Sequence, residues 1–316
     1  MDATILGLHH VTAIASDPQR NLDFYTQVLG LRLVKLTVNF DDPTTYHFYF
    51  GDAQGRPGTL LTFFPWIGMP QGRQGTGETI AVSFAVPQDA LGFWAERLKR
   101  REVQVDPITA LGGEPGLAFD DPDGMRVELV ASKSESRGDT WTGAPVAPEH
   151  AIGALHSVTL AEEGYETTAR LLTETLGFRL AGQQENRFRY EVAAGGAGTY
   201  VDLLCLPDAQ PGRMGAGTIH HIAFRAPDDA QQLAWREELV RLRVNVTPVM
   251  DRQYFHSIYF REPGGVLFEI ATDPPGFAID EAPERLGTHL KLPPQYERQR
   301  AQIEQVVPNL RLPGQR

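Results

Sequence analysis

The stretch ILGLHHVTAIA, residues 5–15, places two adjacent histidines in the middle of an apolar run that is typical of a buried strand. The stretch GTIHHIAFRA, residues 217–226, repeats this arrangement. Side chains alternate across a strand, so the two histidines of each pair point to opposite faces. One imidazole of each pair can therefore enter a common site, while its neighbour supports it or lies in the core.

Four segments of the chain share one plan, which is an apolar strand, an amphipathic helix and then several strands rich in Val, Phe, Tyr and Leu. The opening strands are LHHVTAIAS (8–16), ETIAVSFAVP (78–87), ALHSVTLAEEG (154–164) and GTIHHIAFRAP (217–227). The helices are predicted over NLDFYTQVLG (21–30), ALGFWAERLKRR (90–101), ETTARLLTETLG (166–177) and DAQQLAWREELVRL (229–242). The order βαβββ, repeated four times, predicts an α+β fold of four modules.

The chain also divides by composition. Polar residues rich in Gly, Pro and Ser at 133–151 predict a linker between the second and third modules. We therefore expect an N-terminal domain of two modules at 1–132 and a C-terminal domain of two modules at 152–275. Residues 276–316 contain several prolines and many charges, and they are predicted to form a surface tail with one short helix near Tyr296–Gln305.

The composition is that of an ordinary globular protein, with 41% hydrophobic and 22% charged residues. A formal net charge of −11 disfavours binding to nucleic acid or to an anionic membrane. Cys205 is the single cysteine, which excludes an internal disulfide and fits a reducing, cytoplasmic setting. The start MDATILGLHH lacks the features of a signal peptide, and no apolar stretch approaches the ~18 residues of a membrane span.

Several motifs have a family likeness beyond the repeat itself. They are LHHVT (8–12), YHFYFGD (46–52), GTIHHIAF (217–224), YFREPGGVLFEIATDPPGF (259–277) and LGTHLKLPPQYE (286–297). The four-module plan resembles the vicinal-oxygen-chelate superfamily of glyoxalases and extradiol dioxygenases, and these motifs resemble the ring-cleaving dioxygenases that open hydroquinones. The resemblance covers nearly the whole chain. It implies that the modules pair into two curled open sheet barrels, with a metal inside a cup.

Three residues are the candidate metal ligands. The second histidine of the pair is present only in the first and fourth modules, as His10 and His221. Glu269 lies in the apolar strand VLFEIAT, where a buried carboxylate is costly unless it is paired or binds a metal. If these modules pair, His10, His221 and Glu269 form a facial triad with three open positions, which suits Fe(II). Thr62 stands where a glyoxalase-type isomerase would add a fourth ligand, and threonine does not readily supply one.

A second ligand set stays open at this point. It consists of His156, His221 and Glu269, and it would imitate extradiol enzymes whose ligands all lie in the C-terminal half. His156 aligns with the non-ligand member of the pair, which favours the first set. Glu128 of the second module has no matching imidazole, so modules two and three are predicted to bind no metal, with Glu128 as an ion-pair partner. The histidines without a visible partner are interpreted as structural: His47, His150, His256 and His289.

Other residues are candidates to act beside the metal. Tyr259 begins the strand YFREP, and the PGG turn separates it from the strand of Glu269, so antiparallel pairing can bring its hydroxyl to the site. The resemblance implies active-site roles for Tyr259, His220, His9 and Thr12. It also implies an arginine upstream of the tyrosine, for which Arg252 is the candidate. Aromatic strand residues that can line an apolar pocket are Phe255, Phe268, Tyr46 and Phe48, although most of these are expected to be core residues.

The predicted function is a non-haem Fe(II) dioxygenase, with Mn(II) as the alternative ion, that inserts O₂ and opens hydroquinone-like or catechol-like rings. The expected partners are a small aromatic substrate and O₂, without nucleic acid or membrane, and a homo-oligomer is left open. Three other functions compete: a glyoxalase-type isomerase or lyase on a small-molecule adduct, a thiol transferase of the antibiotic-resistance type, and a non-catalytic aromatic-ligand-binding protein. The missing fourth ligand weighs against the isomerase or lyase. The length of four modules weighs against both the isomerase and the thiol transferase, and the intact triad weighs against a non-catalytic binding protein.

Overall fold

The computed structural model describes residues 4–110, 112–133 and 139–314, so part of the predicted linker, 134–138, lies outside the described residues. The strands are β1 (Leu8–Ala15), β2 (Arg32–Val38), β3 (Tyr46–Gly51), β4 (Leu60–Pro65), β5 (Glu78–Val86), β6 (Asp106–Ala110), β7 (Glu114–Asp120), β8 (Arg126–Ala131), β9 (Leu155–Glu162), β10 (Arg179–Gln184), β11 (Arg187–Glu191), β12 (Tyr200–Cys205), β13 (Ile219–Ala226), β14 (Met250–Asp251), β15 (Phe255–Arg261) and β16 (Leu267–Pro275). The α-helices are α1 (Pro18–Asp23), α2 (Leu91–Arg100), α3 (Glu166–Arg170), α4 (Asp229–Arg241) and α5 (Arg300–Val306). π-Helical turns at Phe24–Val28 and Leu171–Thr175 extend α1 and α3, and 3₁₀ turns lie at Pro148–His150, Phe277–Ile279, Pro283–Arg285 and Pro294–Gln299.

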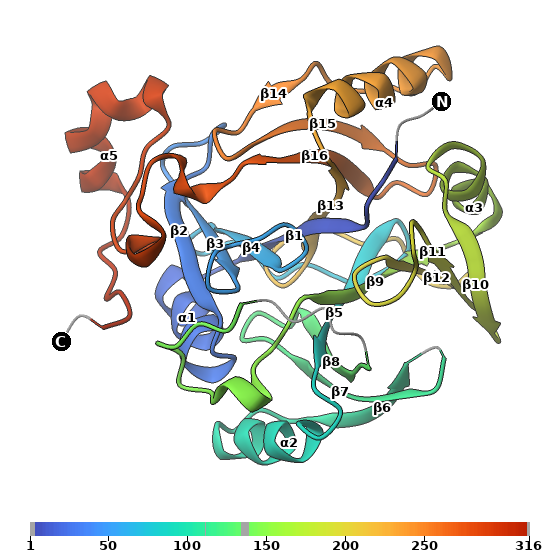
Figure 1. Cartoon of the computed structure of the whole chain (residues 1–316), viewed down its shortest axis with the longest axis horizontal. Coiled ribbons are helices and arrows are strands. Elements are labelled where there is room, and N and C mark those ends of the chain that lie inside the picture. The colour runs from blue at the N-terminus through green and yellow to red at the C-terminus, as the bar shows by residue number, and fades with distance from the viewer. Residues whose placement is uncertain (1–3, 111, 134–138, 315–316) are drawn as a thin grey trace.

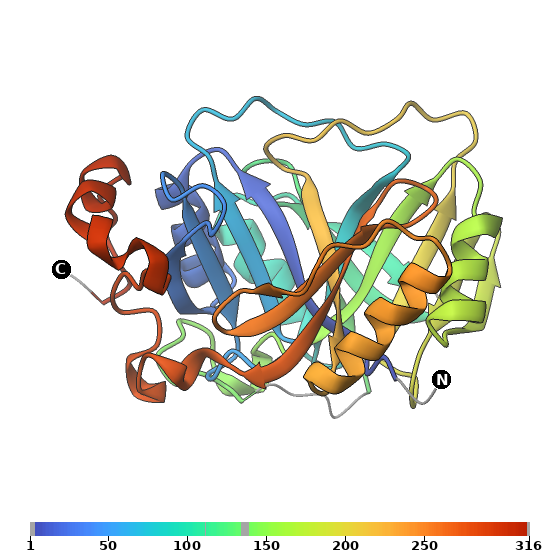
Figure 2. The same ribbon diagram turned by 90° about the horizontal axis from the view of Figure 1, so that it is seen from above.

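The described strands form two eight-stranded sheets, ordered β14-β15-β16-β13-β1-β4-β3-β2 and β10-β11-β12-β9-β5-β8-β7-β6. The first sheet joins modules one and four through the antiparallel pair β1–β13, and the second joins modules two and three through β5–β9. Both sheets curl, with helices on their outer sides (Figures 1 and 2). The predicted α+β fold of four paired βαβββ modules is confirmed. The division into domains at 1–132 and 152–275 stays a prediction. Each sheet is built from one module of each of these halves, so the halves are consecutive in sequence but share both sheets.

Two faces of each sheet have different chemistry, because successive side chains of a strand alternate. The outer face packs on the helices, where Leu22, Trp94, Leu172 and Trp235 are buried in the main hydrophobic core. Tyr46, Phe48 and Phe268 belong to this core, as expected for most of the four candidate pocket aromatics. The inner face of the first sheet is left to carry polar groups.

Long connections hold the two sheets together. The segment after β4 and the segment after β12 run beside each other, with bridges Gln71–Ala216 and Arg73–Arg213. Figure 2 shows both connections along one side of the molecule. They fix the relative position of modules that are distant in sequence.

The tail packs on the first sheet through a buried cation. The Nζ atom of Lys35, in β2, lies 2.6 Å from Asp280 and 2.5 Å from Glu281, and its side chain is fully buried. Farther along the tail, Leu290 bridges to Leu36 of the same strand. The short helix predicted near Tyr296–Gln305 is present as the 3₁₀ turn Pro294–Gln299 followed by α5. The tail therefore covers the edge strand β2 of the sheet (Figure 1).

A buried carboxyl pair lies where the two sheets meet. Glu162, at the end of β9, and Glu262, after β15, are 1% and 2% exposed. Burial, and then the Glu262 carboxylate, raise the pKa of Glu162 to about 8. Its Oε1 atom has no hydrogen-bond partner among the described residues. Glu162 is therefore a neutral acid in the folded chain at neutral pH.

We expect the pH dependence of stability to change in the variant Glu162→Gln. An unfolded Glu162 loses its proton near 4.5 and the folded one near 8, so the unfolded state binds fewer protons between these values. The wild-type free energy of unfolding should therefore fall as the pH rises through this window, and the glutamine variant should lack this contribution. Urea unfolding across the window measures it. Glu163→Gln, which changes an exposed neighbour, is the control, and equal slopes for wild type and Glu162→Gln would contradict the prediction.

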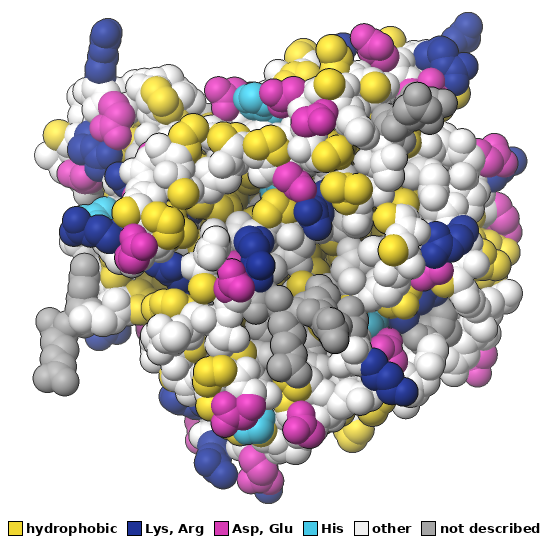
Figure 3. Space-filling model, viewed as in Figure 1, with side chains coloured by type: hydrophobic (Ala, Val, Ile, Leu, Met, Phe, Trp, Pro, Cys, Tyr) yellow, Lys and Arg dark blue, Asp and Glu magenta, His cyan; other side chains and the backbone are white. Residues whose placement is uncertain are grey.

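Charged side chains of both signs are spread over the surface of the molecule. On the face in Figure 3, Lys and Arg side chains are interspersed with Asp and Glu. Among the described helices, none has both the length and the apolar character needed to cross a membrane.

Candidate metal centre

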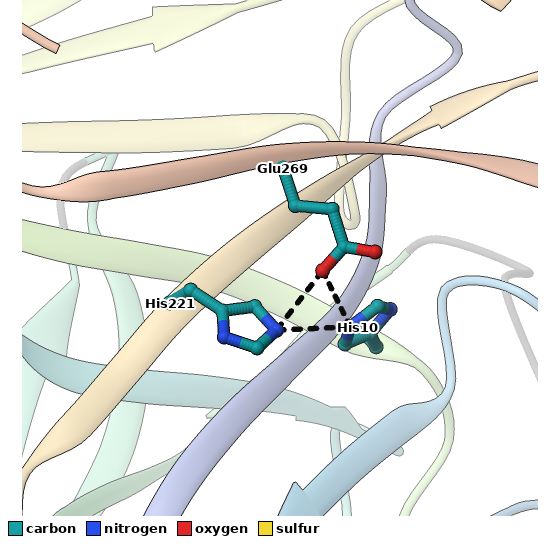
Figure 4. A group of neighbouring side chains, drawn as sticks. All are labelled: His10, His221 and Glu269. Atoms are coloured by element: carbon teal, nitrogen blue, oxygen red, sulfur yellow. Dashed lines mark hydrogen bonds and ion pairs between the residues drawn. The ribbon is translucent and has the colours of Figure 1, made fainter. Parts of the chain in front are cut away.

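Three strands of the first sheet bring His10, His221 and Glu269 together. β13 lies between β1 and β16, with Thr12 opposite His221 and Ala223 opposite Glu269. The Nε2 atoms of His10 and His221 lie 3.4 Å apart, and Glu269 Oε2 lies 3.2 Å and 2.9 Å from them. Figure 4 shows the two rings and the carboxylate pointing at one another.

The protonation of His10 follows from its neighbour. His9 Nε2 lies 3.2 Å from the carbonyl oxygen of Thr272, which only accepts, so His9 carries its proton on Nε2. Burial lowers the pKa of His9 well below its usual value, so the ring is neutral and its Nδ1 is an acceptor. His10 Nδ1, at 2.9 Å, must then be the donor to His9 Nδ1. The Nε2 lone pair of His10 is therefore free to face His221 and Glu269.

The second histidine pair repeats the arrangement. His220 Nδ1 and His221 Nδ1 are 2.7 Å apart. Burial, and then the neighbouring His221, lower the pKa of His220 to about 3, so this ring is neutral. Burial also lowers the pKa of His221. If the Nε2 atom of His221 presents a lone pair as His10 does, its Nδ1–H donates to His220, and His220 carries its own proton on Nε2.

The carboxylate of Glu269 uses its two oxygens differently. Oε1 accepts a hydrogen bond of 2.5 Å from the Ser257 hydroxyl, while the buried Oε2 has no hydrogen-bond partner among the described residues. Burial alone would raise the pKa of Glu269, and protonated His10 and His221 would hold this pKa well below its usual range. With lone pairs facing Oε2 instead, a bound cation must supply that positive charge. An ionised, unpartnered oxygen in the interior is costly unless a cation neutralises it.

These atoms form a set of donors that fits a divalent metal ion. Two imidazole Nε2 atoms and one carboxylate oxygen converge, and together they are the two-histidine, one-carboxylate set of non-haem Fe(II) sites. In the described part of the chain, this is the one group of three or more histidine, cysteine or acidic side chains whose ligand atoms lie within 4.8 Å of one another.

A cavity of about 280 Å³ opens onto His10 and His221. Its volume is at the lower end of small-molecule sites, as expected for a ligand of one ring. The lining includes His10, His47, Tyr49, Phe64, Trp66, His220, His221, Arg252, Phe255, Tyr259 and Leu267, with Asn39, Phe40 and Asp41 completing it. Phe255 lies on the cavity as predicted. The mixture of flat rings and a few polar groups suits a polar aromatic ligand.

Arg252 and Tyr259, both predicted for the site, reach it together. Tyr259 stands opposite Glu269 in the antiparallel pair β15–β16. Arg252 Nε donates to the Tyr259 hydroxyl at 3.3 Å, and the guanidinium also pairs with Asp41 at 3.1 Å. Burial raises the pKa of Tyr259, so its hydroxyl stays protonated at neutral pH.

His9 and Thr12 lie behind the cavity wall. His9 contacts His10 as described above, and Thr12 Oγ1 lies 2.8 Å from Thr62 Oγ1. Neither is part of the cavity lining, while the predicted residue His220 is. The active-site roles of His9 and Thr12 therefore stay predictions, and any effect they have must pass through the residues they contact.

Sequence reasoning missed His47 and Tyr49, which both line the cavity. His47 Nδ1 lies 2.9 Å from the Tyr49 hydroxyl, and its Nε2 lies 3.0 Å from Thr62 Oγ1. The signal was the alternation in YHFYFG, in which His47 and Tyr49 share the face opposite Phe48 and Phe50. The sequence did not show whether that face of the strand points to the cavity or to the core.

The second sheet has different residues at the corresponding positions. His156 lies in β9 of this sheet, away from His221 and Glu269 of the first sheet, and pairs with Glu114 at 3.0 Å, so the alternative ligand set that included it is wrong. Glu128 accepts a hydrogen bond of 2.6 Å from Ser83, and it forms no ion pair of the predicted kind with any described residue. Asp202 lies opposite Thr159, and this position is equivalent to that of Thr62 opposite Thr12 in the first sheet. Arg189 binds Asp202 at 2.7 Å.

Comparison with known proteins places these features in a family context. The model of the Glyoxalase/Bleomycin resistance protein/Dioxygenase superfamily matches residues 7–129 and 154–270. "Putative ring-cleaving dioxygenase MhqO" of Bacillus subtilis is 50% identical over 300 residues, which are 95% of each chain. "Chlorohydroquinone/hydroquinone 1,2-dioxygenase" of Sphingobium indicum is 36% identical over 300 residues, 92% of each chain.

Solved structures agree with the fold. The crystal structure of a "putative dioxygenase" from Bacillus subtilis superposes with a TM-score of 0.94 at 48% identity, covering 98% of this chain and 99% of that one. Glyoxalase I from Zea mays superposes with a TM-score of 0.62 at 15% identity, covering 84% and 92%, and this similarity concerns the fold alone.

Proposed function

The chain belongs to the Glyoxalase/Bleomycin resistance protein/Dioxygenase superfamily, and from that premise we propose that it is a non-haem Fe(II)-dependent dioxygenase that opens hydroquinone-like or catechol-like rings. It is a ring-cleaving dioxygenase, and thus an oxidoreductase, as relatives named as a ring-cleaving dioxygenase or a hydroquinone 1,2-dioxygenase are 50% and 36% identical over nearly its whole length. An aromatic substrate and O₂ are its reactants.

One observation carries the proposal, namely the buried, unpartnered Oε2 of Glu269 between the Nε2 atoms of His10 and His221. These three residues would hold the metal. Three protein ligands leave positions for both an aromatic oxygen and O₂. Thr62 supports this reading, since its neutral hydroxyl is engaged by Thr12 and His47 and offers no fourth carboxylate.

When bound, Fe(II) would supply Lewis acidity that lowers the pKa of a phenol, together with a redox centre for O₂. The chain's own residues would do the rest. His9 and His220 orient the two ligating imidazoles through the paired Nδ1 atoms. His220 would hold its Nε2 proton toward the cavity, and Tyr259, held by Arg252, would offer a second proton there. Both are suited to donate a proton beside the ring.

The cavity favours a flat ring. His47 lies between Tyr49 and Phe64, with ring centroids 4.0 Å and 4.4 Å away, and this row forms one wall. Phe64 also contacts Trp66 at 5.3 Å. Such a wall packs against the face of an aromatic ligand.

Reconstitution with Fe(II) under nitrogen, followed by O₂ uptake, tests the proposed function. We expect the enzyme to consume one O₂ per ring with hydroquinone or methylhydroquinone and to form a product with new near-ultraviolet absorption. Catechol, assayed in parallel, ranks ortho-diols against para-diols, and reconstitution with Mn(II) tests the choice of ion.

Absence of uptake with all three diols, despite one tightly bound metal per chain, would contradict the proposal. The glyoxalase-type isomerase would then be tested with thiol adducts of 2-oxoaldehydes.

A further inference from the structure

A chain of four hydrogen-bonding side chains runs from the core of the first sheet to the cavity. Thr12 Oγ1 lies 2.8 Å from Thr62 Oγ1, and His47 Nε2 lies 3.0 Å from the same Thr62 oxygen. On the other side of the ring, His47 Nδ1 lies 2.9 Å from the Tyr49 hydroxyl. Thr12 and Thr62 are fully buried, and Tyr49 is 1% exposed. This row of hydrogen bonds therefore begins in the interior, at Thr12, and ends on Tyr49, which lines the cavity.

Burial fixes the direction of these hydrogen bonds. A buried hydroxyl proton without an acceptor is rare because it costs the full desolvation penalty. Within the described residues, the Thr12 hydroxyl has Thr62 Oγ1 as its sole partner, so Thr12 donates to Thr62. The Thr62 proton must then go to its other partner, His47 Nε2.

The tautomer of His47 follows from this. Burial, and then the nearby His10, lower the pKa of His47 well below its usual value, so the ring is neutral and carries one proton. Because Nε2 accepts from Thr62, that proton lies on Nδ1 and is donated to the Tyr49 oxygen. The hydroxyl proton of Tyr49 is then left without an acceptor in the described chain.

We propose that Tyr49 is a substrate-binding residue whose hydroxyl donates a hydrogen bond into the cavity, to the substrate oxygen that is not bound to the metal. The proposal rests on the proposed function, since it assumes a dihydroxybenzene with one oxygen at the metal. Tyr49 is held rigidly for this task, as its ring contacts Phe255 and Tyr254 edge-on, with centroids 6.4 Å and 6.1 Å away, and Phe277 of the tail at 5.1 Å.

A hydrogen-bond donor beside the second substrate oxygen suits the change in that oxygen during ring oxidation. As the ring gives electrons to O₂, the proton of its second oxygen passes to solvent in the cavity and that oxygen becomes ketone-like. An acceptor of that kind binds an oriented O–H more tightly than a phenol does. Donors that are oriented before the reaction stabilise such a change at little cost. Thr12, Thr62 and His47 are thus positioning residues, and Tyr49 is the group that touches the ligand.

Binding of three phenols to the Fe(II)-loaded enzyme under nitrogen separates the roles that Tyr49 can have. Hydroquinone carries a second hydroxyl, para-methoxyphenol carries a second oxygen that only accepts, and para-cresol carries no second oxygen. We expect Tyr49→Phe to weaken the binding of hydroquinone and para-methoxyphenol by about 2- to 10-fold, the size of one hydrogen bond, and to leave para-cresol unchanged. Calorimetry measures all three affinities.

Variants of the neighbouring residues complete the test. Thr62→Val, which removes the hydroxyl that orients His47, should weaken the same two ligands, and Thr62→Ser should restore them. Tyr254→Phe is the matched control, because it removes a hydroxyl from the same aromatic cluster that binds Asp280 of the tail at 3.1 Å and does not line the cavity.

The outcomes are distinguishable. Equal weakening of all three phenols by Tyr49→Phe, or no weakening of para-methoxyphenol, would overturn the assignment of Tyr49 while leaving ring cleavage intact. Wild-type enzyme that binds none of the phenols would overturn the proposed function, and this inference with it.

Discussion

Replacing His221 with alanine is expected to abolish metal binding while leaving the fold largely intact. Its Nε2 is one of three atoms that converge in the first sheet, 2.9 Å from Glu269 Oε2 and 3.4 Å from His10 Nε2. Two remaining ligands cannot hold a divalent ion with comparable affinity. Ring cleavage should therefore fall by more than the ~100-fold that loss of a ligand's supporting partner costs. Mass spectrometry measures the loss of metal, and far-ultraviolet circular dichroism checks that the fold is kept.

The matched control is another buried histidine on an equivalent opening strand. His156, in β9, pairs with Glu114 in the second sheet, so His156→Gln should keep the wild-type metal content. Wild-type metal content in His221→Ala would show that the proposed ligand set is wrong. Loss of the fold in His221→Ala would be seen in the circular dichroism, and a His221→Gln variant, which keeps more of the side-chain volume, would then replace it.

Replacing Lys35 with methionine is expected to lower the free energy of unfolding by about 3–5 kcal/mol, the typical cost of breaking a buried ion pair by removing one partner. The side chain of Lys35 is fully buried, and it is bound by Asp280, Glu281 and the carbonyl oxygen of Phe277. Without it, the Glu281 carboxylate, whose side chain is 4% exposed, would be left without its cation. Urea unfolding measures the loss.

The same variant tests how the tail supports the cavity. Phe277 and Glu281 belong to the tail, and Phe277 contacts Tyr49. Lys35→Met should therefore release the tail locally, which limited proteolysis would detect as cleavage after β16. The double variant Lys35→Met/Glu281→Gln removes the unpaired charge and should regain much of the stability. A single variant as stable as wild type would show that the ion pairs contribute little.

Much of the fold could be predicted from the sequence because it rests on local periodicity. The strand, helix and strand pattern of each module depends on residues close in sequence, and its repetition predicted four modules. The paired histidines and Glu269 in an apolar strand were also visible, since a buried ionisable group is costly wherever its strand is packed. The choice of His10 over His156 needed only the comparison of equivalent positions.

The cavity wall was less predictable. Alternation shows that His47 and Tyr49 share one face of β3 and that Tyr46 and Phe48 share the other. It does not show which face meets the helices and which meets the metal ligands, because that depends on how the sheet curls. Arg252 is a similar case, as its approach to Tyr259 depends on a turn between β14 and β15.

The sequence by itself determined the modules, the α+β class and the types of ligand, since these depend on periodicity and on the cost of burying charge. Only the tertiary structure decided that β13 lies between β1 and β16, which brings His10 to residues more than two hundred positions away. It also decided the directions of the hydrogen bonds from Thr12 to Tyr49. The physical reason is that proton positions and ligand geometry depend on distances between strands, and such distances are set by packing across the whole sheet rather than by neighbours in the chain.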